Sequence, residues 1–188
     1  MKISNVEVYG LEQSIRASKL PMSTSLDDLT SQITETVKKL SRASPGSGHD
    51  QFLTGIIVQF DLTISLKMWT EMQRYHFIDF VSSQSTMHRI AKFKLEDQVN
   101  EYVDKGILDI LNAKIKVYNE NPTPENYLHI LYNIPTGFEL TARLTTNYRE
   151  LKTQYYQRRN HRLPEWREYC KWIETLPESY LIIGRQNA

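Results

Sequence analysis

The sequence predicts an α+β fold, a single domain over residues 1–188 in which helices pack on a small, mostly antiparallel sheet. Helical and strand patterns are mixed along the chain without the β-α-β alternation of a parallel sheet. The length of 188 residues suits one domain. With 40% hydrophobic and 24% charged residues, the composition excludes a disordered chain.

Three segments alternate with the period of two residues that is typical of strands. They are Lys2–Tyr9, Phe52–Ser65 and Phe138–Leu144. In the second segment one face is expected to be apolar and to lie on the core. It carries Ile56, Val58, Phe60, Leu62 and Ile64, opposite Gln59, Asp61 and Thr63.

Helices are predicted where apolar residues recur at spacings of three and four and where a cap precedes them. A helix capped by Ser25 is expected to end near Ser41, before the loop residues 44–48. The other predicted helices cover residues 66–73, 95–119, 124–131 after Thr123-Pro124, 147–159 capped by Thr146, and a last one from Pro164 that ends before Pro177.

Charge and cysteine content exclude several classes. The chain has 23 Lys+Arg and 22 Asp+Glu, so a general polyanion binder is excluded and nucleic acid is an unlikely partner. The single cysteine, Cys170, makes neither an internal disulfide nor a multi-cysteine zinc site, and it reads as a core residue. The five histidines lack metal-ligand spacing. No apolar run is long enough to cross a membrane and no signal core is seen, so a cytoplasmic protein is expected.

Two polar constellations are candidates for ligand binding. On the helix from residue 147, one face carries Asn147, Leu151, Gln154 and Arg158, spread over about 16 Å, and it either contacts a long ligand or is solvated. Residues 74–89 are rich in hydroxyl, imidazole and guanidinium groups, which suit an oxygen-rich anion such as a phosphate. A polar loop with a helix cap is the alternative for this segment.

Two further segments are weaker candidates for ligand binding. Gly46–Asp50 contains His49 but lacks the Lys-Ser/Thr ending of a phosphate-binding loop. A basic, aromatic region near the C-terminus could stack and neutralise single-stranded nucleic acid, although glutamates interrupt it. Its residues are Tyr155, Tyr156, Arg158, Arg159, Arg162, Trp166 and Arg167.

Together these segments resemble the flavin-dependent thymidylate synthases. Residues 146–151, TNYREL, are similar to the family's T-N-x-R-x-L, and Tyr155, Arg158 and Glu165-Trp166 follow. Gly48-His49-Asp50 is similar to the family's G-H-E. After the strand, Arg74 resembles the first arginine of R-H-R-x-x-S-x-N-E-x-S-x-R-Y. The resemblance covers most of Gly48 to Trp166.

The chain also departs from the family pattern. Tyr75-His76 replaces the second and third residues of R-H-R, and Val81-Ser82 stands where Asn-Glu is expected. A shift of two residues would place Ser83-Gln84 there, with Thr86 at the serine and His88 at the last arginine. Alternatively, Ser85 is the serine. His161 and Arg162 straddle the position of a later family histidine.

The resemblance implies ligands and roles for particular residues. The implied nucleotide-binding residues are Arg74, Gln84, Ser85, Thr86, His88, Arg89 and Arg158, and the implied cofactor-binding residues are His49, Arg74, His76, Asn147 and Arg149. Arg158 would polarise the pyrimidine by stabilising negative charge. FAD would accept a hydride from NADPH, and a folate would supply a carbon for the uracil ring of dUMP. A homotetramer is also implied.

Three functions therefore remain open: a divergent flavin-dependent pyrimidine nucleotide methylase, a non-catalytic protein that binds a nucleotide on the same scaffold, and a nucleic-acid-associating module. Replacement of an acid and an arginine of the family signature by Ser, Gln and His favours the second somewhat over the first.

Overall fold

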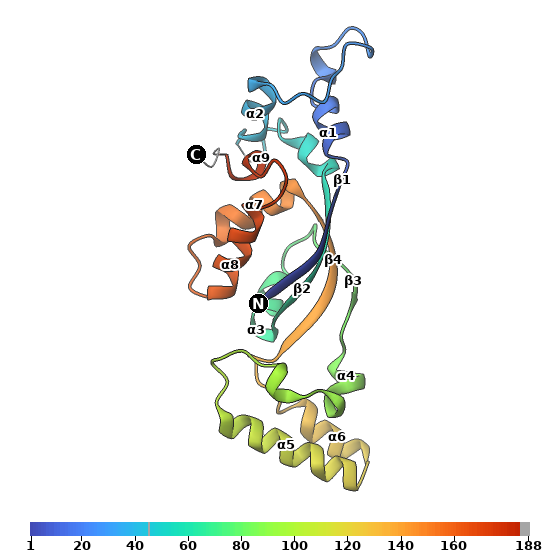
Figure 1. Ribbon diagram of the computed structural model, residues 1–188, viewed down its shortest axis with the longest axis vertical. Coiled ribbons are helices and arrows are strands. Elements are labelled where there is room, and N and C mark those ends of the chain that lie inside the picture. The colour runs from blue at the N-terminus through green and yellow to red at the C-terminus, as the bar shows by residue number, and fades with distance from the viewer. Residues whose placement is uncertain (45, 185–188) are drawn as a thin grey trace. The chain divides into compact units, whose positions relative to one another are not determined.

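The computed structural model describes residues 1–44 and 46–184, which include a four-stranded sheet (Figure 1). Its strands are β1 (Lys2–Tyr9), β2 (Ile57–Ser65), β3 (Asp79–Ser83) and β4 (Glu139–Asn147), in the order β1-β2-β4-β3. Two backbone hydrogen bonds, Leu66 N to Phe138 O and Tyr148 N to Ile56 O, join opposite ends of β2 and β4, so this pair is antiparallel. The sheet with its covering helices confirms the predicted α+β class.

The chain divides into two compact units, and the division runs through the strands. The first unit consists of Met1–Ser4, Asp61–Arg74 and Phe80–Arg143. The second consists of Asn5–Phe60, Tyr75–Asp79 and Leu144–Ala188. The single-domain boundary of residues 1–188 stays a prediction.

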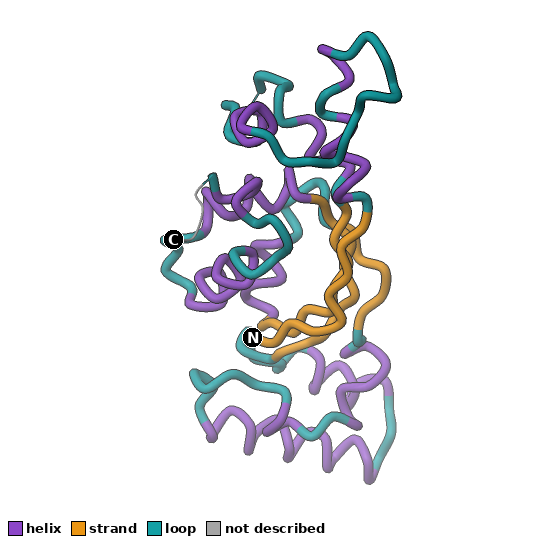
Figure 2. The backbone as a smooth tube through the Cα atoms, turned by 45° about the horizontal axis from the view of Figure 1, so that its top comes forward, coloured by secondary structure: helices purple, strands orange, loops and turns teal. Residues whose placement is uncertain are grey.

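The first unit contains α3 (Leu66–Met72), α4 (Thr86–Arg89), α5 (Lys105–Glu120) and α6 (Pro124–Leu131). α5 and α6 pack side by side as a helical hairpin (Figures 1 and 2). As predicted, Thr123 caps α6: its hydroxyl accepts a hydrogen bond from Asn126 N at 3.2 Å. The core of this unit is apolar and comprises Ile90, Leu95, Leu108, Leu111, Ile130 and Phe138.

Two predictions for the first unit are wrong in part. The long helix begins at Lys105 instead of Leu95, because Val99 forms an antiparallel bridge with Phe138 and Asn100 N donates to Gly137 O. These tertiary hydrogen bonds hold the backbone extended where the apolar spacing predicts a helix. In addition, residues 79–83 form the strand β3, although they show no alternating pattern.

The second unit contains α1 (Leu11–Ala17), α2 (Glu35–Ser41), α7 (Tyr148–Arg158), α8 (Pro164–Ile173) and α9 (Tyr180–Ile183), with a 3₁₀ segment, η2 (Gln51–Gly55), before β2. The centre of the Phe60 ring lies 4.5 Å from that of the Trp172 ring, so Phe60, on the predicted apolar face of β2, packs on α8. Ile56, Val58 and Phe60 are all fully buried, as are Leu62 and Ile64 in the first unit, which confirms the predicted face.

Two helix starts in the second unit differ from the prediction. The helix expected from Ser25 begins only at Glu35, where Thr34 accepts a hydrogen bond from Val37 N. Residues 26–33 are non-helical, since Arg16 binds the carbonyl oxygens of Leu26 and Leu29. The cap of α7 is Asn147 rather than Thr146. Gly46–Gly48 lie in turns and bends, as expected of a loop, while Pro45 lies outside the described residues.

Two kinds of feature are absent from the described residues. No helix in them is long and apolar enough to span a membrane. No group of three or more His, Cys, Asp and Glu side chains within residues 1–44 and 46–184 is placed to hold a metal ion.

Candidate functional site

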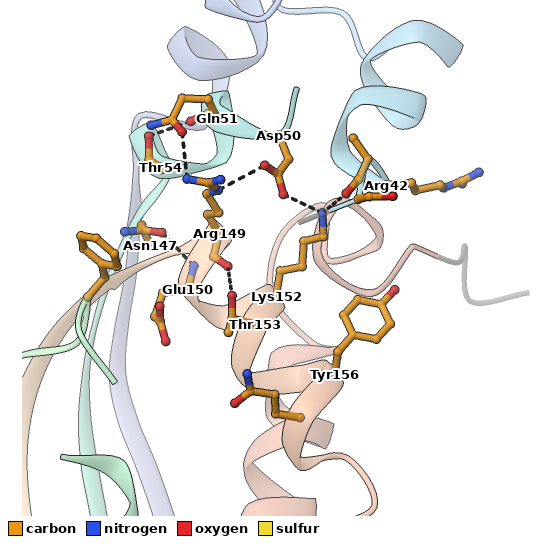
Figure 3. A pocket seen from close by; sticks show the side chains of 14 residues that line it. Arg42, Asp50, Gln51, Thr54, Asn147, Arg149, Glu150, Lys152, Thr153 and Tyr156 are labelled. Atoms are coloured by element: carbon orange, nitrogen blue, oxygen red, sulfur yellow. Dashed lines mark hydrogen bonds and ion pairs between the residues drawn. The ribbon is translucent and has the colours of Figure 1, made fainter. Parts of the chain in front are cut away.

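A cavity of about 770 Å³ lies in the second unit, beside the N-terminal half of α7 (Figure 3). Residues 42–44, which follow α2, form one wall, and Asp50, Gln51 and Thr54 form another. Phe77 closes a third side. The remaining lining residues come from the start of α7 and its next turns: Asn147, Arg149, Glu150, Lys152, Thr153, Tyr156 and Gln157.

The junction of β4 and α7 positions this wall. Asn147 is extended, and its side-chain oxygen accepts a hydrogen bond from Glu150 N at 2.9 Å, which caps the helix. Tyr148 is fully buried, and its N–H donates to Ile56 O at 3.0 Å. The strand therefore ends and the helix begins at a defined residue, and Asn147 and Arg149 come to line the cavity.

Asp50 joins two cations of α7. One carboxylate oxygen accepts from Arg149 Nε at 3.1 Å and the other from Lys152 Nζ at 2.8 Å (Figure 3). Lys152 also donates to the carbonyl oxygens of Ser41 at 2.7 Å and Ala43 at 3.0 Å. All three ammonium donors of Lys152 are thus used, so this buried cation ties α7 to the end of α2 and to Asp50.

Arg149 is only partly engaged by these contacts. Its Nε binds Asp50, and its Nη1 donates to the Gln51 side-chain oxygen at 2.8 Å. These two hydrogen bonds leave further donors of the guanidinium for a ligand. Arg42 also lines the cavity, and Figure 3 shows its side chain extending away from Asp50 and Lys152.

Glu150 is a buried carboxyl group in the cavity wall. Gln154 Nε2 donates to it at 3.2 Å, and the hydroxyl of Tyr169 donates to the Gln154 oxygen at 2.9 Å. Burial raises the pKa of Glu150; the hydrogen bond from Gln154 and the nearby His76 offset the rise in part. The arrangement provides a proton-binding group at the end of a buried chain of hydrogen bonds.

Arg158 lies in an aromatic surrounding at the end of α7. Its Nε donates to the Tyr75 hydroxyl at 2.7 Å. Its guanidinium carbon lies 4.6 Å from the centre of the Trp166 ring and 5.5 Å from that of Tyr75. Tyr75 in turn donates to the Gln157 side-chain oxygen at 2.9 Å. A guanidinium stacked in this way is stabilised by the electron-rich ring faces.

The face of α7 that carries Arg158 is largely buried, and its contact with a long ligand stays a prediction. Leu151 and Gln154 are fully buried, and Arg158 is 8% exposed. The alternative, a solvated face with an exposed arginine, is wrong. Among the described residues, Arg158 does not line the cavity that holds Asn147 and Arg149.

The two predicted histidines of the second unit are exposed. His49 directly precedes Asp50, and the His76 ring lies 6.1 Å from that of Phe77, a cavity-lining residue. The structure therefore brings Asn147 and Arg149 together in one cavity wall. Each of the two histidines directly precedes a residue that lines this cavity. Their roles as flavin contacts stay predictions.

Most of the predicted residues of the first unit follow β3 in the chain, between Gln84 and Arg89, while Arg74 follows α3. Gln84 continues the pairing with β4: its N–H donates to Thr141 O, and its side-chain oxygen accepts from Thr141 N, both at 2.9 Å. The Thr86 carbonyl accepts from the Tyr127 hydroxyl at 3.2 Å. Ser85 precedes α4 without a side-chain cap bond. Arg74, His88 and Arg89 are exposed.

Sequence reasoning missed Lys152 and Glu150. Lys152 follows Arg149 by three residues on a predicted helix, so a shared face could have been noticed. Its partner Asp50 is 102 residues away along the chain, and no local pattern reveals that pairing. Glu150 pairs with Gln154 four residues later on the same helix, but Gln154 is in turn bound by Tyr169 of α8, which the local pattern does not reveal.

Comparison with known proteins shows the fold. No protein-family model and no curated protein sequence matches the chain. The solved structures similar to it include flavin-dependent thymidylate synthase ThyX from Helicobacter pylori complexed with FAD and dUMP, at a TM-score of 0.76 and 15% identity over 97% of this chain and 98% of that chain. A second structure of ThyX from the same organism with FAD and dUMP has a TM-score of 0.77 and 16% identity over 97% of both chains.

Proposed function

We propose that the chain binds a pyrimidine nucleotide and FAD and transfers a one-carbon unit to the uracil ring. The observation that carries this proposal is the likeness of fold over 97% of the chain to structures that hold FAD and dUMP. The sequence motifs support it independently. Asn147 caps α7 at its junction with β4, and Arg158 is the last residue of the same helix.

The cavity suits a large anionic ligand such as FAD. It has a volume of about 770 Å³ and includes the cap residue Asn147 and the partly engaged Arg149. A helix N-terminus and a guanidinium both favour phosphate oxygens. In this proposal Asn147, Arg149, His49, His76 and Arg74 hold the cofactor, which supplies the hydride chemistry that side chains lack.

Arg158 is proposed to polarise the pyrimidine. A guanidinium stabilises negative charge on a ring oxygen without proton transfer. Tyr75 and Trp166 fix the direction of the guanidinium. The residues proposed to bind the rest of the nucleotide are Arg74, Gln84, Ser85, Thr86, His88 and Arg89.

The co-substrates, the assembly and the compartment are part of the same proposal. NADPH and a folate would be the co-substrates, and a cytoplasmic homotetramer would be the working form. In solution, light scattering tests the tetramer, and NADPH oxidation that depends on dUMP tests the turnover.

A binding protein without turnover is the second candidate. The observation that favours it is the environment of Arg158 and Gln84. Arg158 is buried and already bound to Tyr75, and Gln84 is committed to the backbone of β4. Such residues can hold a nucleotide or support the fold without reaching a reacting atom.

The deciding experiment combines a spectrum with thermal unfolding. Flavin absorbance in the purified protein, together with dUMP-dependent NADPH oxidation, supports the enzyme; a colourless protein stabilised by dUMP supports the binder. At a dUMP concentration of 100 times Kd, binding adds about 2.7 kcal/mol to the free energy of unfolding. For a chain of this length, that is a rise of about 5–10 °C in Tm.

Arg158→Ala is the variant for this test, and Arg159→Ala is its matched control. Arg159 is the next residue and is exposed on the same helix end. We expect Arg158→Ala to abolish the rise in Tm caused by dUMP and Arg159→Ala to retain it. Equal responses of the two variants would show that Arg158 is not part of the nucleotide site.

A further inference from the structure

An arm with an exposed apolar tip follows α1 in the second unit. We define the arm as residues 18–34. Met22 is 91% exposed, Leu26 is 64% exposed and Leu20 is 47% exposed, so three large apolar side chains within seven residues are accessible to solvent. Asp27 and Asp28 are exposed and directly follow Leu26. The tip therefore combines large apolar side chains with two carboxylates.

Hydrogen bonds from α1 and its C-terminal end hold the arm in shape. Arg16 donates to the carbonyl oxygens of Leu26 at 2.9 Å and Leu29 at 3.2 Å. Lys19 donates to both the carbonyl and the hydroxyl oxygen of Thr30, at 2.7 and 2.9 Å. Because these four bonds hold the backbone of Leu26, Leu29 and Thr30 against α1 and its C-terminal end, the arm is presented to a partner with little conformational entropy left to lose.

A groove with apolar and basic lining residues lies on the α5–α6 hairpin of the first unit. It has a volume of about 370 Å³, and Ile110, Ala113 and Val117 of α5 form its apolar lining. Ile110 is 58% exposed and Val117 is 51% exposed. The two titratable residues that line it, Lys114 and His129, are both basic.

We propose that the arm of one copy docks in the α5–α6 groove of a second copy. Met22 and Leu26 fill the apolar lining formed by Ile110 and Val117, while Asp27 and Asp28 face Lys114 and His129. The volume suits this occupant, since a cavity of about 150 Å³ already accommodates one small apolar group and the groove is more than twice that size. Opposite charges at the rim fix the orientation of the tip.

The contact joins two different surfaces of the chain. Two copies that exchange arms reciprocally form an isologous dimer, whereas a one-way contact is heterologous and closes only as a ring. The interaction depends on neither nucleotide nor flavin, so flavin absorbance and stabilisation by dUMP test the proposed ligand binding separately from this contact.

A charge-swap experiment tests the proposal with the full chain. Asp27→Lys/Asp28→Lys makes the arm basic, and Lys114→Glu makes the groove acidic. Each variant alone brings like charges together, so we expect at least tenfold weaker self-association by sedimentation velocity. Mixing the two variants pairs the basic arm with the acidic groove, and we expect hetero-association to return.

Two controls make the result specific. Lys171 is exposed on α8 and belongs to neither surface. Lys171→Glu makes the same change of charge as Lys114→Glu, and this variant should associate like wild type. A Met22→Cys/Ile110→Cys variant should form a disulfide between chains on mild oxidation, because Cys170 is buried and does not compete. The proposal is overturned by a wild type that is monomeric, by a mixture as weak as its components, or by a disulfide that forms only within one chain.

Discussion

The guanidinium carbon of Arg158 lies 4.6 Å from the centre of the Trp166 ring. Both residues are buried, so the attraction between the cation and the ring face acts with little competition from water. The hydrogen bond from Arg158 Nε to Tyr75 adds a fixed direction to this stacking. The planar shape of the guanidinium is therefore as important here as its charge.

Arg158→Lys tests whether the planar shape of the Arg158 guanidinium contributes to stability. Lysine keeps the charge but loses the planar stacking surface and the Nε donor that binds Tyr75. We expect the free energy of unfolding, measured by urea denaturation, to fall by about 1–2 kcal/mol. In Arg159→Lys, the change at an exposed neighbour should stay within about 0.5 kcal/mol. Equal losses in the two variants would contradict a special role for the Trp166 contact.

Lys152→Met tests the ion pair beneath the cavity. The substitution leaves the buried Asp50 carboxylate with Arg149 alone and removes the donor to Ser41 and Ala43. Removing one partner of a buried ion pair costs about 3–5 kcal/mol, and we expect a loss of that size in urea denaturation. The same change at the exposed Lys171 should be nearly neutral. A loss below about 1 kcal/mol for Lys152→Met would mean that water replaces the ammonium.

Elements with a local signal were predictable from the sequence. The alternation from Ile56 to Ile64 predicts the buried face of β2, and Thr123-Pro124 predicts the start of α6. By contrast, β3 is a strand only because its backbone pairs with β4, and its five residues are all exposed. An edge strand without a buried face leaves no period in the sequence to recognise.

The candidate site likewise contains residues that a local motif predicts and residues that only the folded chain brings together. Asn147 and Arg149 follow from a motif within one segment, and the structure places both in one cavity wall. The pairing of Asp50 with Lys152 connects residues 102 positions apart, and such long-range pairs depend on the completed fold. Thr146 was the wrong cap by one residue, since its hydroxyl donates to the Phe77 carbonyl at 2.7 Å and leaves the capping to Asn147.

Asn147→Ala tests whether the cap of α7 and the ligand site can be separated. The alanine removes the acceptor for Glu150 N, so we expect a loss of about 1 kcal/mol in the free energy of unfolding. Asn147→Ser keeps a capping oxygen and should retain most of that stability, while it loses the amide that would contact the ligand. Comparing FAD affinity by fluorescence titration in the two variants distinguishes capping from ligand contact. Retention of full FAD affinity in Asn147→Ser would remove Asn147 from the cofactor site.

Glu150 and Glu35 should change stability with pH in opposite directions. Burial raises the pKa of Glu150 above the value of about 4.3 in the unfolded chain. The folded state then binds the proton more tightly, so this contribution to stability is complete below about pH 4.3 and is lost as the pH rises through the folded pKa. Glu150→Gln has no charge to bury, and we expect its stability relative to wild type to increase from pH 4 to pH 7.

The exposed Glu35 is the matched control of opposite sign. The hydrogen bond and charge of Lys38 lower the pKa of Glu35, so its stabilising contribution is present above the unfolded pKa and is lost as the pH falls through the folded one. Glu35→Gln should therefore lose stability relative to wild type as the pH rises from 3 to 7. Urea denaturation of the three proteins across this range measures both trends. If the difference between Glu150→Gln and wild type is the same at pH 4 and pH 7, burial does not shift the proton affinity of Glu150.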